Sequence, residues 1–303
     1  MRKVLLFLLL VSGTLHLLYA YDVEKNGVCY NFIGTRRAFV THYGLDADSK
    51  KYSGRVVVPS QITHEGVTYT VTSVGENAFA GSEDLTSVQL PSTVRALSAC
   101  AFLGCSGLRQ VTLPENIQVF SSCVFTGCTS LQQITLPRHA ESVDTLTFYC
   151  CASLKSIILP HCVQTVCQRA LEHLPALTDL YCFSSVPPTA ELGAFTLSDQ
   201  QHCTLHVPAD AIELYRKSPL WSDFYRIVSL SNADYTGQNY QRGDVNDDGK
   251  IDADDLALLP RLIVRLPENQ AVRWAADINA DGTVNAVDYV ALARKLSTAP
   301  LSI

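Results

Sequence analysis

The chain has 303 residues, a formal net charge of −6 and eleven cysteines. The acidic balance argues against nucleic acid as a partner, because phosphate binding needs clustered Lys and Arg side chains. A length of this order predicts two domains once a leader segment is removed.

The leader segment is residues 1–20. Its basic start at Arg2 and Lys3, its apolar stretch 4–11 and the small residue Ala20 follow the order of a secretory signal peptide. The apolar stretch is short for a membrane span, which needs about 20 apolar residues. We therefore expect no transmembrane anchor, removal of the segment on export, and a secreted or cell-surface location.

An internal repeat fills residues 71–185. Each unit contains the pattern L-x-x-V-x-L followed by Pro, which is typical of the strand of a leucine-rich repeat. Alternate residues point inward, and Pro ends the strand because it donates no ladder hydrogen bond. The 23-residue period is carried by Leu85, Leu108, Leu131, Leu154 and Leu177, by Phe79, Phe102, Phe125 and Phe148, and by Pro91, Pro114, Pro137 and Pro160.

The ends of the repeat region are predicted to be caps. In the N-terminal cap, residues 21–70, a strand-like segment ends at Pro59 and residues 64–70 are expected to form a hairpin. In the C-terminal cap, residues 186–230, the strand pattern returns before Pro208, and residues 209–224 predict a short amphipathic helix. Its apolar side chains can cover the open end of the stack.

The repeat pattern, seen best from Ala101 to Pro114, resembles the BspA-like leucine-rich repeats of bacterial surface proteins over residues 56–230. The resemblance implies a binding or adhesive role, with a host or envelope protein or a glycan as the ligand. The candidate surface is the outward face of the strands, which includes Arg109, Gln110, Gln132, Gln133 and Ile158. A solvated sheet face without a ligand remains the alternative.

The cysteines follow the repeat. Cys105, Cys128 and Cys151 share one position of the unit, and Cys100 and Cys123 share another. Because Cys is a small, often buried residue, most of them are predicted to be stacked core thiols. Disulfides between coils stay open as an alternative, since equivalent Cα atoms would lie about 5 Å apart.

Residues 231–241 form a short polar segment that predicts a linker, so the two modules are expected to move relative to each other. Residues 242–303 then contain two loops with oxygen-bearing side chains at the EF-hand spacing and Gly at position 6. This spacing predicts two Ca2+ sites. The candidate ligands are Asp244, Asn246, Asp248, Lys250 (through its carbonyl), Asp252 and Asp255 in the first loop, and Asp277, Asn279, Asp281, Thr283, Asn285 and Asp288 in the second.

One helix is predicted after each loop, at residues 253–266 and 286–296, and position 12 is Asp in both loops. Over residues 243–297 the segment resembles a type I dockerin, a small all-α EF-hand-like domain. The resemblance implies calcium-dependent attachment to a cohesin-like protein module. The corresponding contact residues are Ala253, Asp254, Arg261, Ala286, Val287 and Arg294. The hydroxyl pair common in this family is missing, and Pro260 is expected to kink the first helix.

No recognisable catalytic motif accompanies any of the eight histidines, so the chain is not expected to be an enzyme. The predicted fold is an α/β solenoid of leucine-rich repeats, a parallel β ladder with short turns or helices, plus the dockerin-like domain. The alternative function is a non-catalytic accessory role in a polysaccharide-degrading assembly. A glycoside hydrolase is less favoured, although acid pairs can meet only in the fold. A zinc site at His139 and His161 is a further alternative to a surface or capping role.

Overall fold

The computed structural model describes residues 21–44, 49–117, 119–195, 200–231, 233–234, 241–246, 250–265 and 270–298. The expected signal peptide lies outside these ranges, as does most of the expected linker. Among the helices of the described ranges, none combines the length and the apolar character needed to cross a bilayer.

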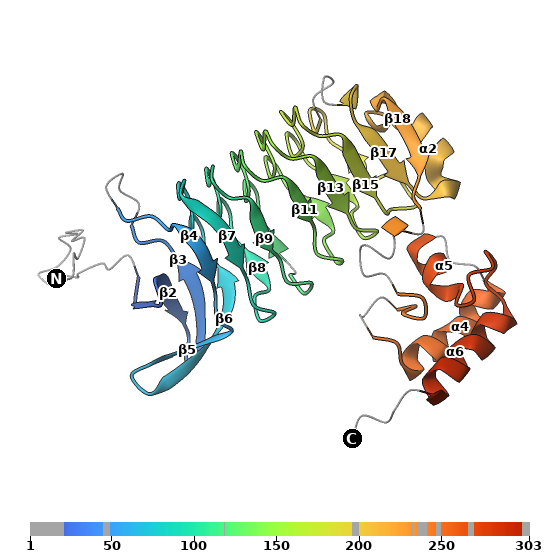
Figure 1. The fold of residues 1–303 in the computed structure, drawn as a ribbon, viewed down its shortest axis with the longest axis horizontal. Helices are drawn as coiled ribbons and strands as arrows, with labels where there is room; N and C mark the ends of the chain where they lie inside the picture. Colours follow the sequence, from blue (N-terminus) through green and yellow to red (C-terminus); the bar gives the residue numbers. More distant parts are fainter. Residues whose placement is uncertain are drawn as a thin grey trace, which may run out of the picture.

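The described residues between 54 and 229 form a solenoid in which successive coils stack along one axis (Figure 1). One face carries the longer strands. They form two parallel sheets, β4–β7–β9 and β11–β13–β15–β17–β18. Their bounds are β4 Gly54–Val57, β7 Leu85–Gln89, β9 Gln110–Thr112, β11 Gln133–Thr135, β13 Ser156–Leu159, β15 Asp179–Cys182, β17 Thr204–Val207 and β18 Arg226–Ser229.

A second set of parallel strands, two residues long apart from β6, lines another side of each coil. It continues from β6 through β8 and β10 and resumes as β12–β14–β16. The bounds are β6 Val67–Val74, β8 Ala96–Leu97, β10 Val119–Phe120, β12 Ser142–Val143, β14 Thr165–Val166 and β16 Thr189–Ala190. In the described residues between β7 and β16 the connections are turns rather than helices.

The register of the sheet reproduces the sequence period. Gln133 pairs with Ser156, and Ser156 pairs with Asp179, so the steps from β11 to β13 and from β13 to β15 are each one 23-residue unit. This confirms the prediction of a parallel ladder of stacked leucine-rich repeats. Hydrogen bonds between coils satisfy backbone groups that a single coil leaves unpaired.

The core of the solenoid contains a continuous stack of aromatic rings. The centroids of Phe79 and Phe102 are 4.9 Å apart, those of Phe102 and Phe125 5.2 Å, and those of Phe125 and Phe148 5.7 Å. All four side chains are fully buried. Each repeat therefore buries its apolar side chains against the same side chains of its neighbours, which a single repeat cannot do.

Two positions of the repeat unit have a left-handed backbone. One is Gly in the first coils and becomes non-glycine later, with φ of 67° at Gly104, 72° at Gly127, 61° at Cys150 and 59° at His173. The later residues adopt, with a Cβ, a conformation that is unstrained only for Gly. The free-energy cost of the left-handed turn is therefore higher in the C-terminal coils.

Cysteines occupy two different environments. The Sγ atoms of Cys105, Cys128 and Cys151 donate to backbone carbonyls of the preceding coil at 3.1, 3.2 and 3.1 Å. These three residues are fully buried, as predicted, and burial raises the pKa of Cys105 and Cys151 to about 12. Cys100 and Cys123 instead sit half-buried at the second left-handed turn position, with φ of 57° and 61°. The prediction of core thiols is wrong for this second pair, and all eleven cysteines are free thiols.

The N-terminal cap is a small antiparallel unit. Strands β1 (Val23–Lys25), β2 (Val28–Ile33) and β3 (Arg37–Thr41) form a meander, and β3 then pairs with β6 in parallel. The predicted hairpin is present as β5 (Gln61–His64) paired with β6. Tyr52 covers the first ring of the aromatic stack, with its centroid 4.7 Å from that of Phe79.

Residues 209–224, where one helix is predicted, contain three short helical pieces. They are η1 (Ala209–Ala211), α2 (Ile212–Lys217) and η2 (Trp221–Asp223). The helix ends because Ser218 is extended, as is usual for the residue before a proline. Tyr215, Trp221 and Phe224 are nevertheless buried and cover the last coil, as predicted.

The C-terminal segment contains α4 (Ala253–Val264), α5 (Gln270–Ala276) and α6 (Ala286–Thr298). Helices α4 and α6 correspond to the two predicted ones, and α4 continues through Pro260 rather than ending there. Helix α5 is not among the predicted elements. A small core of Val245, Leu259, Ala276 and Leu292 joins the three helices to the first loop.

The C-terminal segment also contacts the solenoid. Trp274 and Ala275 of α5 pack with Ile158, Phe183 and Leu230. The structure therefore differs from the expectation that the two modules move relative to each other. The linker sequence is polar, but the solenoid and α5 contact each other through apolar side chains.

Candidate calcium-binding and partner-binding site

The first acidic loop is closed by the carboxylate of Asp255, the residue at position 12. Its oxygens accept hydrogen bonds from the backbone N–H groups of Val245, Asn246 and Asp252 at 2.7, 3.1 and 2.8 Å. Asp252 in turn caps α4 by accepting from the N–H of Asp254 at 2.9 Å. Asp255 is fully buried, so its carboxylate faces the loop and not the solvent.

The second loop is built in the same way 33 residues later. Asp288 accepts from the N–H groups of Asn279 and Asn285 at 3.2 and 2.9 Å, and Asn285 accepts from the N–H of Val287 at 2.8 Å. These bonds match those of Asp255 and Asp252 position by position. The repetition shows that the described residues of the two loops share these hydrogen bonds.

Further carboxylates in the second loop are held by backbone amides. Asp277 accepts from the N–H groups of Asp281 and Gly282 at 3.0 and 3.1 Å. Asp281 accepts from the hydroxyl and the N–H of Thr283 at 2.6 and 2.8 Å. The hydroxyl bond, followed by the N–H bond and a bond from Asn279, lowers the pKa of Asp281 below its ordinary value. Gly282 has a φ of 86°, which gives the turn a residue without a Cβ.

The chemistry of these side chains fits a hard cation. The donors are carboxylate, amide and hydroxyl oxygens, the ligands that calcium takes at six to eight positions. A carboxylate has about four acceptor sites, so Asp255 and Asp288 keep acceptor capacity beyond their N–H bonds. In the ranges that the structure describes, no three His, Cys, Asp or Glu side chains converge as metal ligands. Asp248 lies outside those ranges, and Lys250 is exposed.

An arginine accompanies position 1 of each loop. The guanidinium of Arg138, from the solenoid, lies 3.4 Å from the carboxylate of Asp244. The guanidinium of Arg242 lies 3.0 Å from the carboxylate of Asp277 and 4.6 Å from the ring centroid of Trp274. Sequence reasoning missed Arg138, since it is separated from Asp244 by 106 positions.

The six predicted partner-binding residues are all exposed. Ala253 and Asp254 form the first turn of α4, and Ala286 and Val287 form the first turn of α6. Arg261 and Arg294 follow at the same offset in each helix. Val287 is 57% exposed and its neighbour Val290 45%, so apolar side chains on α6 face the solvent.

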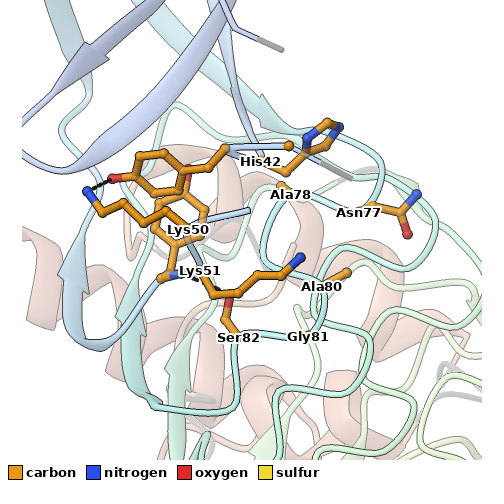
Figure 2. Close-up of a pocket in the computed structure, with 11 residues that line it drawn as sticks. His42, Lys50, Lys51, Asn77, Ala78, Ala80, Gly81 and Ser82 are labelled. Carbon is orange, nitrogen blue, oxygen red and sulfur yellow. Dashed lines mark hydrogen bonds between the residues drawn. The ribbon is translucent and has the colours of Figure 1, made fainter. Parts of the chain in front are cut away.

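A second candidate region is a pocket of about 320 Å³ between the N-terminal cap and the first repeat, which sequence reasoning did not single out (Figure 2). His42, Lys51, Asn77 and Ser82 line it. Lys50 lies at its rim, where its ammonium donates to the Tyr43 hydroxyl at 2.9 Å. The pocket is lined by residues of the cap and of the first repeat, and by none of the two acidic loops.

His139 and His161 are brought close together, as the zinc alternative requires. Burial, followed by the positive charges of His139 and Arg138, lowers the pKa of His161 to about 4. The Sγ atom of Cys162 is 3.2 Å from the Nε2 atom of His161. In the described chain, no three His, Cys, Asp or Glu side chains converge as metal ligands, either there or elsewhere.

A parallel-strand solenoid followed by two matched acidic loops defines a modular, repeat-based binding protein. Comparison with known families agrees with this class. Residues 61–191 match the model of the BspA type leucine-rich repeat region in six copies, and residues 242–297 match that of the dockerin type I domain. The chain thus carries BspA-type leucine-rich repeats and a type I dockerin domain.

These families define the general properties of the chain. Type I dockerin domains bind calcium, and a dockerin implies a cohesin partner. Neither family is catalytic, and both are typical of extracellular or surface proteins.

Several solved structures are similar to the chain. A leucine-rich-repeat protein of T. pallidum is 28% identical, with a TM-score of 0.46, and the match covers 53% of this chain and 71% of that one. A leucine-rich-repeat protein of Bacteroides ovatus is 17% identical, with a TM-score of 0.36 and coverage of 69% and 77%. A leucine-rich cell surface protein of Faecalibacterium prausnitzii is 15% identical, with a TM-score of 0.35 and coverage of 71% and 96%. No curated protein matches the chain.

Proposed function

We propose that the protein is an exported, non-catalytic binding protein. Its solenoid recognises a protein or glycan, and its dockerin domain attaches it to a cohesin-like module in a calcium-dependent way. The observation that carries the proposal is the pair of loops with matching hydrogen bonds, in which Asp255 and Asp288 occupy equivalent buried positions.

The proposed dockerin domain spans residues 242–303 and has an all-α, EF-hand-like arrangement. Two calcium ions would be held by the twelve candidate ligands, six in each loop. When bound, calcium supplies charge compensation for carboxylates that otherwise repel one another. Ordering of the loops would then keep the starts of α4 and α6, with Ala253, Asp254, Ala286 and Val287, in position for a partner.

A calcium titration of the whole chain tests the two sites. We expect two binding events by calorimetry, and we expect the double variant Asp244→Ala with Asp277→Ala to lose both, because position 1 of each loop is removed. Asp254→Ala is the matched control, since it removes an exposed carboxylate that is not a proposed ligand. Heats that are unchanged in the double variant would contradict the assignment.

Attachment is tested by capture from the envelope and culture medium of the source organism. The expected partner is a cohesin-like module that is retained with calcium and released by a chelator. Arg261→Ala with Arg294→Ala should weaken this capture without changing the calcium titration. Retention that is insensitive to both chelator and variant would argue against a dockerin-type attachment.

The proposed ligand surface of the solenoid is the exposed strand face around Arg109, Gln110, Gln132 and Gln133. Incubation with a panel of matrix proteins and a panel of polysaccharides separates an adhesive role from an accessory role in a polysaccharide-degrading assembly. Turnover of any glycan would contradict the non-catalytic assignment.

A further inference from the structure

The outward face of the strands changes from polar to apolar side chains where α5 covers it. The outward residues Thr112 and Thr135 are exposed, whereas Ile158, the next residue in the same row, is only 6% exposed. Tyr181 continues the row in register and packs against the same cluster. Because Thr gives way to Ile and Tyr only at the coils that meet the dockerin domain, this part of the face is built as an apolar docking surface.

The occupant of this surface is α5 of the same chain. Trp274 is 8% exposed and Ala275 is 3% exposed where they meet the sheet. Figure 1 shows the three helices lying beside the C-terminal coils of the solenoid. The cohesin-contact positions belong to α4 and α6 and are exposed, so docking through α5 uses a different helix of the domain.

Two ion pairs span the interface. Arg273 and Asp210 are 2.8 Å apart, with side chains 34% and 42% exposed, so solvent screens their attraction. Arg138 and Asp244 are 3.4 Å apart, with side chains 11% and 0% exposed. The second pair is therefore the stronger electrostatic contact, and Asp244 is also position 1 of the first loop.

We propose that this interface opposes calcium binding in the first loop, because Arg138 neutralises the carboxylate that serves there as the first calcium ligand. The inference rests on the proposed calcium function of that loop. A guanidinium and a divalent cation at one buried carboxylate repel each other. By linkage, loading of the first loop weakens docking as much as docking weakens loading, so calcium releases the dockerin domain from the solenoid.

The second loop provides the contrast. Its position-1 residue, Asp277, pairs with Arg242, which belongs to the same module and stacks on Trp274. Arg242 therefore stays beside Asp277 when the dockerin domain separates from the solenoid. The two loops therefore differ in how strongly their calcium affinity depends on docking.

The first test measures calcium affinity in the full chain with Asp277→Ala as the background, which leaves only the first loop. Arg138→Gln should raise its affinity about tenfold, the effect of removing one nearby partly buried charge. Ile158→Glu should raise it similarly by disrupting the apolar contact from the solenoid side. Arg95→Gln, at an exposed arginine of an earlier coil, is the matched control and should change the affinity less than twofold.

The outcomes distinguish the two proposals. First-loop affinity that is unchanged in both Arg138→Gln and Ile158→Glu overturns the docking inference and leaves the calcium function intact. Absence of calcium binding in every variant overturns the proposed function itself.

The second test follows the interface directly. The chain has two tryptophans, Trp274 in the interface and Trp221, which is 1% exposed, in the C-terminal cap. With 5-fluorotryptophan in the same background, calcium should increase the solvent-isotope shift of the Trp274 resonance and leave that of Trp221 unchanged. A Trp274 resonance that stays protected from solvent while calcium is bound overturns the inference.

Discussion

At the scale of single residues, His161 makes the free energy of unfolding of the solenoid depend on pH. Its partly buried ring lies near His139 and Arg138, and its pKa is lowered from 6.5 to about 4. Between these two values the unfolded chain binds a proton that the folded chain does not, so the free energy of unfolding falls as pH falls through this window.

We therefore predict that lowering the pH from 7 to 5 destabilises the wild type by about 2 kcal/mol more than the variant His161→Gln. Urea unfolding at the two pH values measures the difference. His173→Gln is a suitable control because the side chain of that histidine is 54% exposed. An equal loss of stability in wild type and His161→Gln would contradict the assignment.

The residue scale also shows what a sequence can and cannot reveal. The spacing of Asp244, Asn246 and Asp252 identifies the loop, because its ligands are local. Arg138 contacts that loop from another module, and nothing in its neighbourhood along the chain marks it. The period groups Cys100 with Cys123 but does not tell a half-buried turn position from a core position.

At the scale of elements, the aromatic stack is the most regular feature of the solenoid. Phe125 lies between Phe102 and Phe148 at 5.2 and 5.7 Å, and its side chain is fully buried. Removal of the ring leaves a cavity that contacts two neighbouring coils.

Phe125→Ala is expected to lower the free energy of unfolding by about 3 to 5 kcal/mol. Val119→Ala, at a residue 53% exposed, should change it by less than about 0.5 kcal/mol. Chemical denaturation of both variants measures the contrast. A cost at Phe125 close to that at Val119 would mean that the coils do not depend on the stack.

Strands were easier to predict than helices. The pattern L-x-x-V-x-L recurs in register, so β7, β9, β11 and β13 follow from it directly. Helix α5 has seven residues, too few for a periodic apolar pattern, and its anchor Trp274 packs on a different module. The C-terminal cap was identified by its aromatic residues, but its helix is interrupted at Ser218 by the following proline.

At the scale of the whole molecule, the stack depends on a period of 23 residues. The pairing of Gln133 with Ser156 and of Ser156 with Asp179 fixes this value in space as well as in sequence. Towards the C-terminal end the step varies, to 25 residues between Asp179 and Thr204 and 22 between Thr204 and Arg226, so a coil of another length keeps its strand in register only where its turns absorb the difference.

Deletion of residues 108–130 removes one complete unit and places Leu131 after Gly107. We expect this variant to fold cooperatively, with a thermal midpoint lower than that of the wild type. Deletion of residues 108–129 leaves one extra residue in the regular part of the stack and should lower the thermal midpoint further, because a turn of that coil must absorb the residue to keep the next strand in register. Circular dichroism during heating distinguishes the two, and similar curves for both deletions would contradict a dependence of the regular coils on the 23-residue step.

The residues at the left-handed turn position make the two ends of the solenoid differ in backbone strain. The early coils place Gly104 and Gly127 there without strain, whereas Cys150 and His173 must hold the same conformation with a side chain attached. Thermal fluctuations should consequently start in the later coils, next to the surface on which α5 rests. The solenoid is thus more rigid at its N-terminal end, and its local unfolding begins in the coils beside α5, the helix proposed to leave the solenoid when calcium binds.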